Sequence, residues 1–220
     1  MTIRLAEPEA RFFEGFCRRQ LRWDVSLPAR VVTSERAIGV FMCPPMGVLA
    51  FFAVPTVERV EPDDAVDAFV PLQQFADLVR DHGQTGMAPS VLPRALVPVG
   101  SAPSLQHLPP TDGWQLPIFA VSGDLVPMVD DATAEFEARS AGLPPRAQET
   151  VAEEIWERPG FGGLPLRALH AARRLGMIAN DSAKVSAATC GPWKRLSTAR
   201  GQVFIYSTGP AARLALHVVR

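Results

Sequence analysis

An uncharged stretch of 21 residues, positions 37–57, constrains this chain most, because two adjacent prolines stand near its middle. A stretch of this length approaches the span of a transmembrane helix. Pro44 and Pro45, however, remove backbone donors and break a helix, and unpaired backbone groups are costly in lipid. We therefore expect two buried strands over 30–43 and 47–54, joined by a turn at the PPMG run, with a membrane segment as the alternative.

Apolar side chains at helical spacing predict helices in several segments. These are residues 8–22, 71–82, 124–141, 146–157 and 164–175. Two later runs, 184–189 and 202–207, have the composition of strands, and a polar, basic loop separates them. Seven prolines make residues 88–117 an extended, Pro-rich arm. No internal repeat is visible. We predict an α+β fold, with an N-terminal β-hairpin or sheet and packed helices, followed by C-terminal helices and a second hairpin.

Charge is divided unevenly along the chain. From Arg158 onward there are ten Lys or Arg residues and one acid, a balance of +9. Residues 1–157 carry 12 basic and 22 acidic residues, a balance of −10. With the Leu-Pro-Pro break after Gly142, this asymmetry predicts an acidic α+β region over 1–142 and a basic helix–hairpin module over 143–220. The basic module predicts an anionic partner, which is nucleic acid, an acidic protein or the chain's own acidic region.

The order of elements over residues 146–208 resembles the winged-helix variant of the helix-turn-helix fold. The resemblance is carried by a helix that ends in RRLGMI at 173–178 and by two strands around a basic loop. It implies that one group of residues faces the DNA groove, namely Arg167, His170, Arg173 and Arg174. It also implies that a second group lies on the wing and contacts phosphate without reading sequence, namely Lys194, Arg195 and Arg200.

A simpler interpretation needs no nucleic acid. The C-terminal arginines would then form ordinary surface ion pairs with acidic residues of the same chain, each contributing little to stability. A further interpretation lies between the two. The acidic runs at 61–67 and 124–137 could cover the basic module and mask it from a partner.

Motifs for catalysis and metal binding are missing from the sequence. Cys17, Cys43 and Cys190 are odd in number and far apart, which indicates free thiols in a reducing cytoplasm rather than disulfides. No spacing of Cys and His fits a zinc site, and no P-loop, GxGxxG or GxSxG motif is present. We therefore expect a cytoplasmic protein with no metal and no cofactor. No catalytic residue can be named, and a non-enzymatic protein is favoured.

Three classes of function remain open. The first is a non-enzymatic binding or regulatory protein whose basic module contacts nucleic acid or an acidic protein. The second is an enzyme or small-ligand-binding protein with an apolar pocket near Phe41, Phe51, Phe52 and Trp114. The third is a structural subunit of an assembly, in which the apolar tail at 214–219 adds an edge strand. The sequence does not define an oligomeric state.

Overall fold

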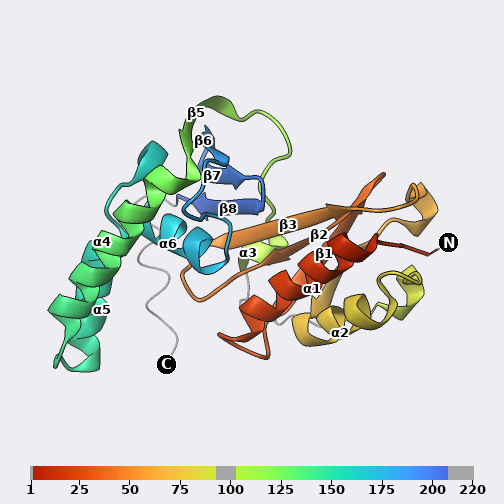
Figure 1. Cartoon of the computed structure of the whole chain (residues 1–220), viewed down its shortest axis with the longest axis horizontal. Helices are drawn as coiled ribbons and strands as arrows, with labels where there is room; N and C mark the ends of the chain where they lie inside the picture. Colours follow the sequence, from red (N-terminus) through yellow and green to blue (C-terminus); the bar gives the residue numbers. More distant parts are fainter. Residues whose placement is uncertain (1, 93–102, 208–220) are drawn as a thin grey trace. The chain divides into compact units, whose positions relative to one another are not determined.

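The computed structural model describes residues 2–92 and 103–207 of the chain (Figure 1). The chain forms two compact units. The first comprises Met1–Leu108 with Arg200–Gln202, and the second comprises Pro109–Ala199 with the residues from Val203 onward. Each unit combines helices with antiparallel strands, which confirms the predicted α+β class. None of the helices in the described residues is long and apolar enough to cross a membrane.

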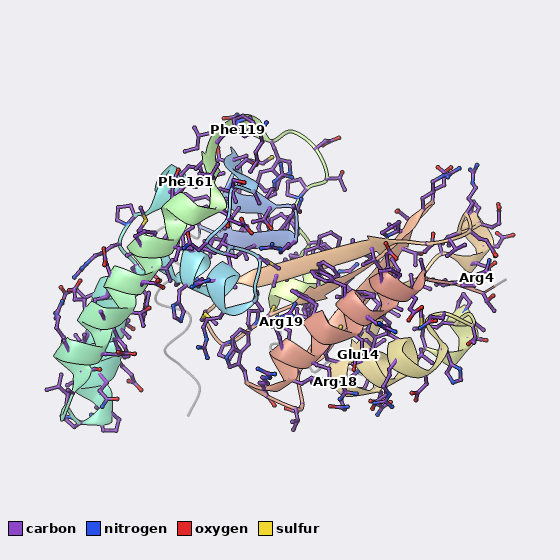
Figure 2. The ribbon with its side chains drawn as sticks, viewed as in Figure 1. Arg4, Glu14, Arg18, Arg19, Phe119 and Phe161 are labelled. Carbon is purple, nitrogen blue, oxygen red and sulfur yellow. The ribbon has the colours of Figure 1, made fainter. Side chains whose placement is uncertain are left out.

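The first unit contains four antiparallel strands in the order β4-β1-β2-β3. Its elements are, in chain order, α1 (Glu7–Leu21), β1 (Pro28–Ser34), β2 (Ala37–Met42), β3 (Leu49–Pro55), η1 (Pro62–Asp64), β4 (Asp67–Pro71), α2 (Leu72–His82), η2 (Pro89–Val91) and α3 (Pro103–Gln106). Helices α1 and α2 lie side by side (Figure 1). Arg18 on α1 joins them, because it contacts Asp77 on α2 at 2.9 Å and Glu14 on its own helix at 2.6 Å (Figure 2).

The uncharged stretch at 37–57 forms the hairpin of β2 and β3, as predicted. Phe41 pairs with Phe51 across the two strands, and Val40 pairs with Phe52. Because neighbouring residues of a strand point to opposite faces, the hairpin carries aromatic rings on both of its faces. The apolar residues of this stretch are therefore divided between the two faces of the hairpin.

Two strands differ from the prediction in the first unit. The run at 30–43 is not one strand but two, β1 and β2, because Glu35 and Arg36 form an exposed turn between them. Strand β4 was not predicted at all. It follows an acidic run and is defined by its antiparallel pairing with β1, in which Ala29 faces Val70. Pairing with β1 therefore defines β4, because five residues of sequence alone do not predict a strand there.

Aromatic rings hold α1 and α2 against the sheet of the first unit. Phe16 stacks on Phe52 with ring centroids 4.7 Å apart, and Phe13 contacts both Phe52 and Phe75 at 5.6 Å. All four rings are buried. Burying each such side chain stabilises the fold by about 1.5–3 kcal/mol. The helix predicted at 8–22 is therefore confirmed as α1, and its apolar face is the one predicted.

The second unit contains four strands in the order β8-β7-β6-β5, with helices on the chain between β5 and β6. Its elements are β5 (Gln115–Val121), α4 (Ser122–Ser140), α5 (Pro145–Trp156), η3 (Phe161–Gly163), α6 (Leu166–Arg174), β6 (Lys184–Cys190), β7 (Trp193–Thr198) and β8 (Gly201–Tyr206). The helices predicted at 124–141, 146–157 and 164–175 are confirmed as α4, α5 and α6. Strand β5 lies at the edge of this order and pairs with β6 alone among the described strands.

Helix α6 ends as the sequence predicts. The amide of Met177 donates to the carbonyl of Ala172 at 2.8 Å, and the amide of Gly176 donates to the carbonyl of Arg173 at 3.1 Å. These two hydrogen bonds define a Schellman motif.

The segment after α6 differs from the prediction. The expected basic loop between two strands contains a strand of its own, β7, so that β6, β7 and β8 follow one another in antiparallel order. A tight turn at Gly191 and Pro192 allows β7 to fold back on β6, and Trp193 and Leu196 are buried. The two-stranded wing is therefore absent from the described residues.

The domain boundary predicted at 142/143 lies between α4 and α5. Both helices belong to the second unit, and Arg139 on α4 contacts Glu154 on α5 at 2.5 Å. Whether residues 143–220 form a separate module stays a prediction.

The arm predicted at 88–117 contains η2, α3 and the start of β5. Its residues 93–102 lie outside the described part of the chain, as does the apolar tail at 214–219.

Candidate functional site

Helix α6 holds the arginines that were expected to enter a DNA groove, and two of them contact acidic residues of the same unit. Arg167 Nε lies 2.7 Å from Glu157 Oε1, just beyond α5. Arg173 Nε lies 3.9 Å from Asp130 Oδ1 on α4. Two of the predicted α6 arginines are therefore already paired with acids near α4 and α5.

His170 on α6 is half-buried against α5. Its ring lies 4.4 Å from that of Trp156, centroid to centroid. Burial lowers the pKa of this imidazole, and the nearby charge of Arg174 lowers it further. Both effects disfavour the charged form of the His170 imidazole in the free protein. Arg174 is the one exposed member of the predicted α6 group.

The cations expected on a wing lie instead on and beside the middle strand β7. Lys194 Nζ donates to the carbonyl of Gly163 in η3 at 2.6 Å. Arg195 points to the opposite face of the strand, and its guanidinium lies 4.2 Å above the ring of Trp114. Arg200 is half-buried in the turn between β7 and β8. Two of the three residues are thus held by contacts with their own unit.

The side of the second unit's sheet that carries Arg195 is rich in aromatic rings. We call this surface the aromatic face, and it comprises Trp114, Phe119, Trp193, Arg195, Phe204 and Tyr206. Trp193 contacts Tyr206 at 4.9 Å and Phe204 at 6.5 Å, and Trp114 contacts Phe204 at 5.9 Å, all between centroids. Burial lowers the pKa of Arg195. Sequence reasoning missed this surface because its members are scattered over β5, β7 and β8.

Charges are segregated between the helices and strands of the second unit. Residues 122–157, which form α4 and α5, contain nine acids and two arginines. Residues 182–207, which form β6 to β8, contain four cations and no acid. The strands therefore offer an anion a more favourable field than the α4–α5 pair does.

The four residues proposed to line an apolar pocket are distributed over different surfaces. Phe41 and Phe51 stack on each other at 4.3 Å on one face of the β2–β3 hairpin. Phe52 points to the other face and packs under α1, while Trp114 belongs to the second unit. The first unit has an open hollow of about 630 Å³ that contacts none of them, and its lining includes Phe12, whose exposed fraction is 43%. A pocket formed by the four remains a prediction.

The cysteines and acids offer no metal centre in the described part of the chain. No group of three or more His, Cys, Asp or Glu side chains there could hold a metal ion. Cys17 is buried in α1, and burial raises the pKa of its thiol to about 12, so that it is not a reactive nucleophile. Cys190 is half-buried near the carbonyl of Asp112.

A family model matches part of the chain, and solved structures share its fold. No curated protein matches the sequence. Residues 109–210 match a family described as a domain of unknown function, DUF8185. Among solved structures, the fold is similar to that of DNA polymerase sliding clamps.

Three clamps illustrate this similarity. The Caulobacter crescentus pol III β structure has a TM-score of 0.56 at 10% identity, over 100% of this chain and 69% of that chain. The Helicobacter pylori β clamp bound to a DNA ligase peptide has a TM-score of 0.54 at 10% identity, over 100% and 70%. The Pseudomonas aeruginosa sliding clamp has a TM-score of 0.52 at 11% identity, over 93% and 65%. This chain thus spans about two thirds of the clamps' length.

The predicted winged helix is therefore wrong. The clamp fold matches nearly the whole chain, including the segment at 146–208 that suggested a winged helix. The order of helices and strands misled the prediction because β7 was taken for a loop and α6 for an exposed helix. What the chain shares with the sliding clamps is its α+β fold.

Proposed function

We propose that this chain is a non-enzymatic binding protein that acts in association with DNA, as a clamp-like module. The observation that carries the proposal is the similarity in fold to DNA polymerase sliding clamps over 93–100% of the chain. One of these clamps was solved with a DNA ligase peptide, so a protein partner is part of the proposal. The inference from fold to function is by analogy.

The distribution of charge supports contact with phosphate rather than reading of bases. Arg167 and Arg173 on α6 are paired with acids of the same unit, so they are less available for reading bases than free arginines would be. The four cations of β6 to β8 have no acid among them in sequence. Cations arranged in this way bind the DNA backbone without sequence preference, and salt weakens the binding.

The predicted cations differ in how available they are for a phosphate contact. Arg174 is exposed and has no acid partner among the described residues, so it is the strongest candidate for a phosphate contact. Lys184 at the start of β6 is also exposed. Arg167 and Arg173 are paired with acids and would have to exchange those partners for phosphate. An acidic protein is the alternative partner for the same cations.

Binding of labelled duplex DNA to the full chain tests the proposal. We expect micromolar affinity at about 50 mM salt and a marked loss at about 200 mM salt, as counterion release predicts. The variant carrying Arg174→Glu and Lys184→Glu should bind more weakly by at least tenfold. The matched control carries Arg22→Glu and Arg36→Glu, which reverse two exposed arginines of the first unit.

The possible results separate the function from its location. Absence of duplex binding at low salt would overturn a direct DNA contact. Equal losses in both double variants would support DNA association but would not place it at Arg174 and Lys184. Selective loss in the Arg174 and Lys184 variant would support the location as well as the function.

A further inference from the structure

The aromatic face forms one continuous side of the second unit's sheet. Phe119 on β5 pairs with Ser186 on β6, which in turn pairs with Ser197 on β7. Paired residues of antiparallel strands share a face, and so do alternate residues of one strand. Arg195 and Trp193 therefore lie on the same side as Phe119. The opposite side carries Lys194, which is tied to η3.

Two large rings of this face are exposed to solvent. The exposed fraction is 70% for Phe119 and 50% for Tyr206. Phe119 lies on the edge strand β5, at the outer margin of the unit (Figure 2), and Tyr206 lies near the end of β8. The spacing of strands and residues separates them by about 20 Å, which is the length of a few nucleotides. Exposed aromatic rings on a shared face indicate a contact surface.

Between these rings lies a guanidinium that has no acidic partner. Arg195 is stacked on Trp114, and no carboxylate among the described residues forms an ion pair with it. Its Nε and the hydroxyl of Ser197 are buried and have no hydrogen-bond partner there. A partly buried guanidinium that lacks an acidic partner favours binding of an anion, because the anion supplies hydrogen-bond acceptors for its N–H groups. The strands around it contain further cations and no acid.

We propose that the aromatic face binds single-stranded nucleic acid, with bases stacked on Phe119 and Tyr206 and with Arg195 donating hydrogen bonds to a phosphate. Exposed rings combined with a cation are the features by which proteins hold single strands without reading their sequence. A duplex keeps its base faces stacked inside, and an acidic peptide would use Arg195 but leave the two rings without planar partners. The proposal goes beyond the proposed function, which concerns the backbone of duplex DNA and makes no use of the exposed rings.

Anisotropy of labelled oligo-dT and oligo-U with the full chain tests this proposal. We expect Phe119→Ala and Tyr206→Ala each to weaken binding by about tenfold, and the double variant to weaken it further. Tyr206→Phe should bind as the parent does, because stacking needs the ring and not the hydroxyl. Arg195→Ala should weaken binding and reduce the slope of log affinity against log salt concentration by about one. The control is Phe161→Ala, which removes a half-buried ring on η3 without touching the aromatic face.

The results distinguish this site from the other surfaces of the chain. The proposal is overturned if single strands do not bind at low salt, or if Phe119→Ala and Tyr206→Ala bind like the parent chain. It is also overturned if poly-glutamate binds through Arg195 while single strands do not, since an acidic protein would then be the partner. If Arg195→Ala fails to fold, the binding of Phe119→Ala and Tyr206→Ala still tests the proposal. Duplex binding that survives the ring variants shows that the two functions are separate.

Discussion

At Gly162 the chain approaches β6 so closely that a side chain has no room. A Cβ atom there would lie 2.3 Å from the Cβ of Ala187, and the φ angle of +66° belongs to the left-handed region. Gly162→Ala should therefore suffer both a steric clash and backbone strain. We expect it to lower the free energy of unfolding by about 2–4 kcal/mol, measured by urea denaturation of the full chain.

Gly142→Ala is the matched control for that substitution. Gly142 has a similar φ of +72°, but nothing lies within 4 Å of the position that its Cβ would take. Only the backbone strain remains, so the expected loss is about 1 kcal/mol. Equal losses at the two glycines would show that the close approach of η3 to β6 contributes nothing.

The contact between Arg195 and Trp114 could not be predicted from the sequence. The run WKRLST is polar and follows Gly191-Pro192, which is typical of a turn, so β7 was taken for a loop. Its arginine is accommodated by an indole that lies on the chain before β5. Sequence reasoning selected Arg195 for its charge, whereas the fold gives it an aromatic neighbour.

At the level of elements, helices were predicted better than strands. The apolar faces of α1, α4, α5 and α6 repeat at a spacing that the sequence shows directly. Strands β4 and β7 are short and contain charged residues, and β4 also depends on a partner, β1, that is distant in sequence. The α6 arginines were correctly placed on a helix, but the acidic neighbours of Arg167 and Arg173 could not be predicted, because Glu157 and Asp130 approach them only in three dimensions.

The α4–α5 pair is held by a group of ion pairs that should respond to acid. Arg158 and Arg139 contact Glu135 at 2.6 and 2.9 Å, and their hydrogen bonds lower the pKa of Glu135 from 4.5 to about 2. A lowered folded-state pKa contributes stability that is present above pH 4.5 and is lost as the pH falls toward 2. Glu135→Gln should therefore be less stable than the parent at pH 6 and differ little from it near pH 2, measured by thermal unfolding.

Glu137→Gln serves as the control on the same helix. Glu137 is exposed, and the described residues give it no ion pair, so its substitution should leave the unfolding midpoint unchanged at both pH values. High salt should narrow the gap between the parent and Glu135→Gln, since these charges are open to solvent. A gap at pH 6 that persists unchanged at pH 2 would contradict the ion-pair explanation.

Across the whole molecule, the two units share an arrangement that the sequence does not reveal. In each, an edge strand leads directly into a helix, β4 into α2 and β5 into α4. In each, that strand pairs with the first of three successive strands, β1 or β6. No repeat is visible in the residues because only the pattern of strand pairing and the strand-to-helix link recur, and different side chains fill the two cores.

The unequal charge of the chain has two explanations at this scale. Acids of α4 and α5 pair with Arg158, and acids of the same unit contact Arg167 and Arg173. Part of the C-terminal excess is therefore neutralised inside the second unit, as the simpler interpretation expected. Residues 182–207 contain no acid of their own, and the cations Lys184 and Arg195 within them carry the proposals for nucleic acid.

The limits of the second unit lead to a prediction about fragments. Ser122 at the start of α4 exchanges hydrogen bonds of 2.7 and 2.8 Å with Ala179, and Leu125 and Val129 are buried. A fragment of residues 143–220 lacks these contacts and also lacks β5, the partner of β6. We expect residues 109–220 to unfold cooperatively in urea and residues 143–220 to show no transition. A cooperative transition in the shorter fragment would instead support the boundary at 142/143.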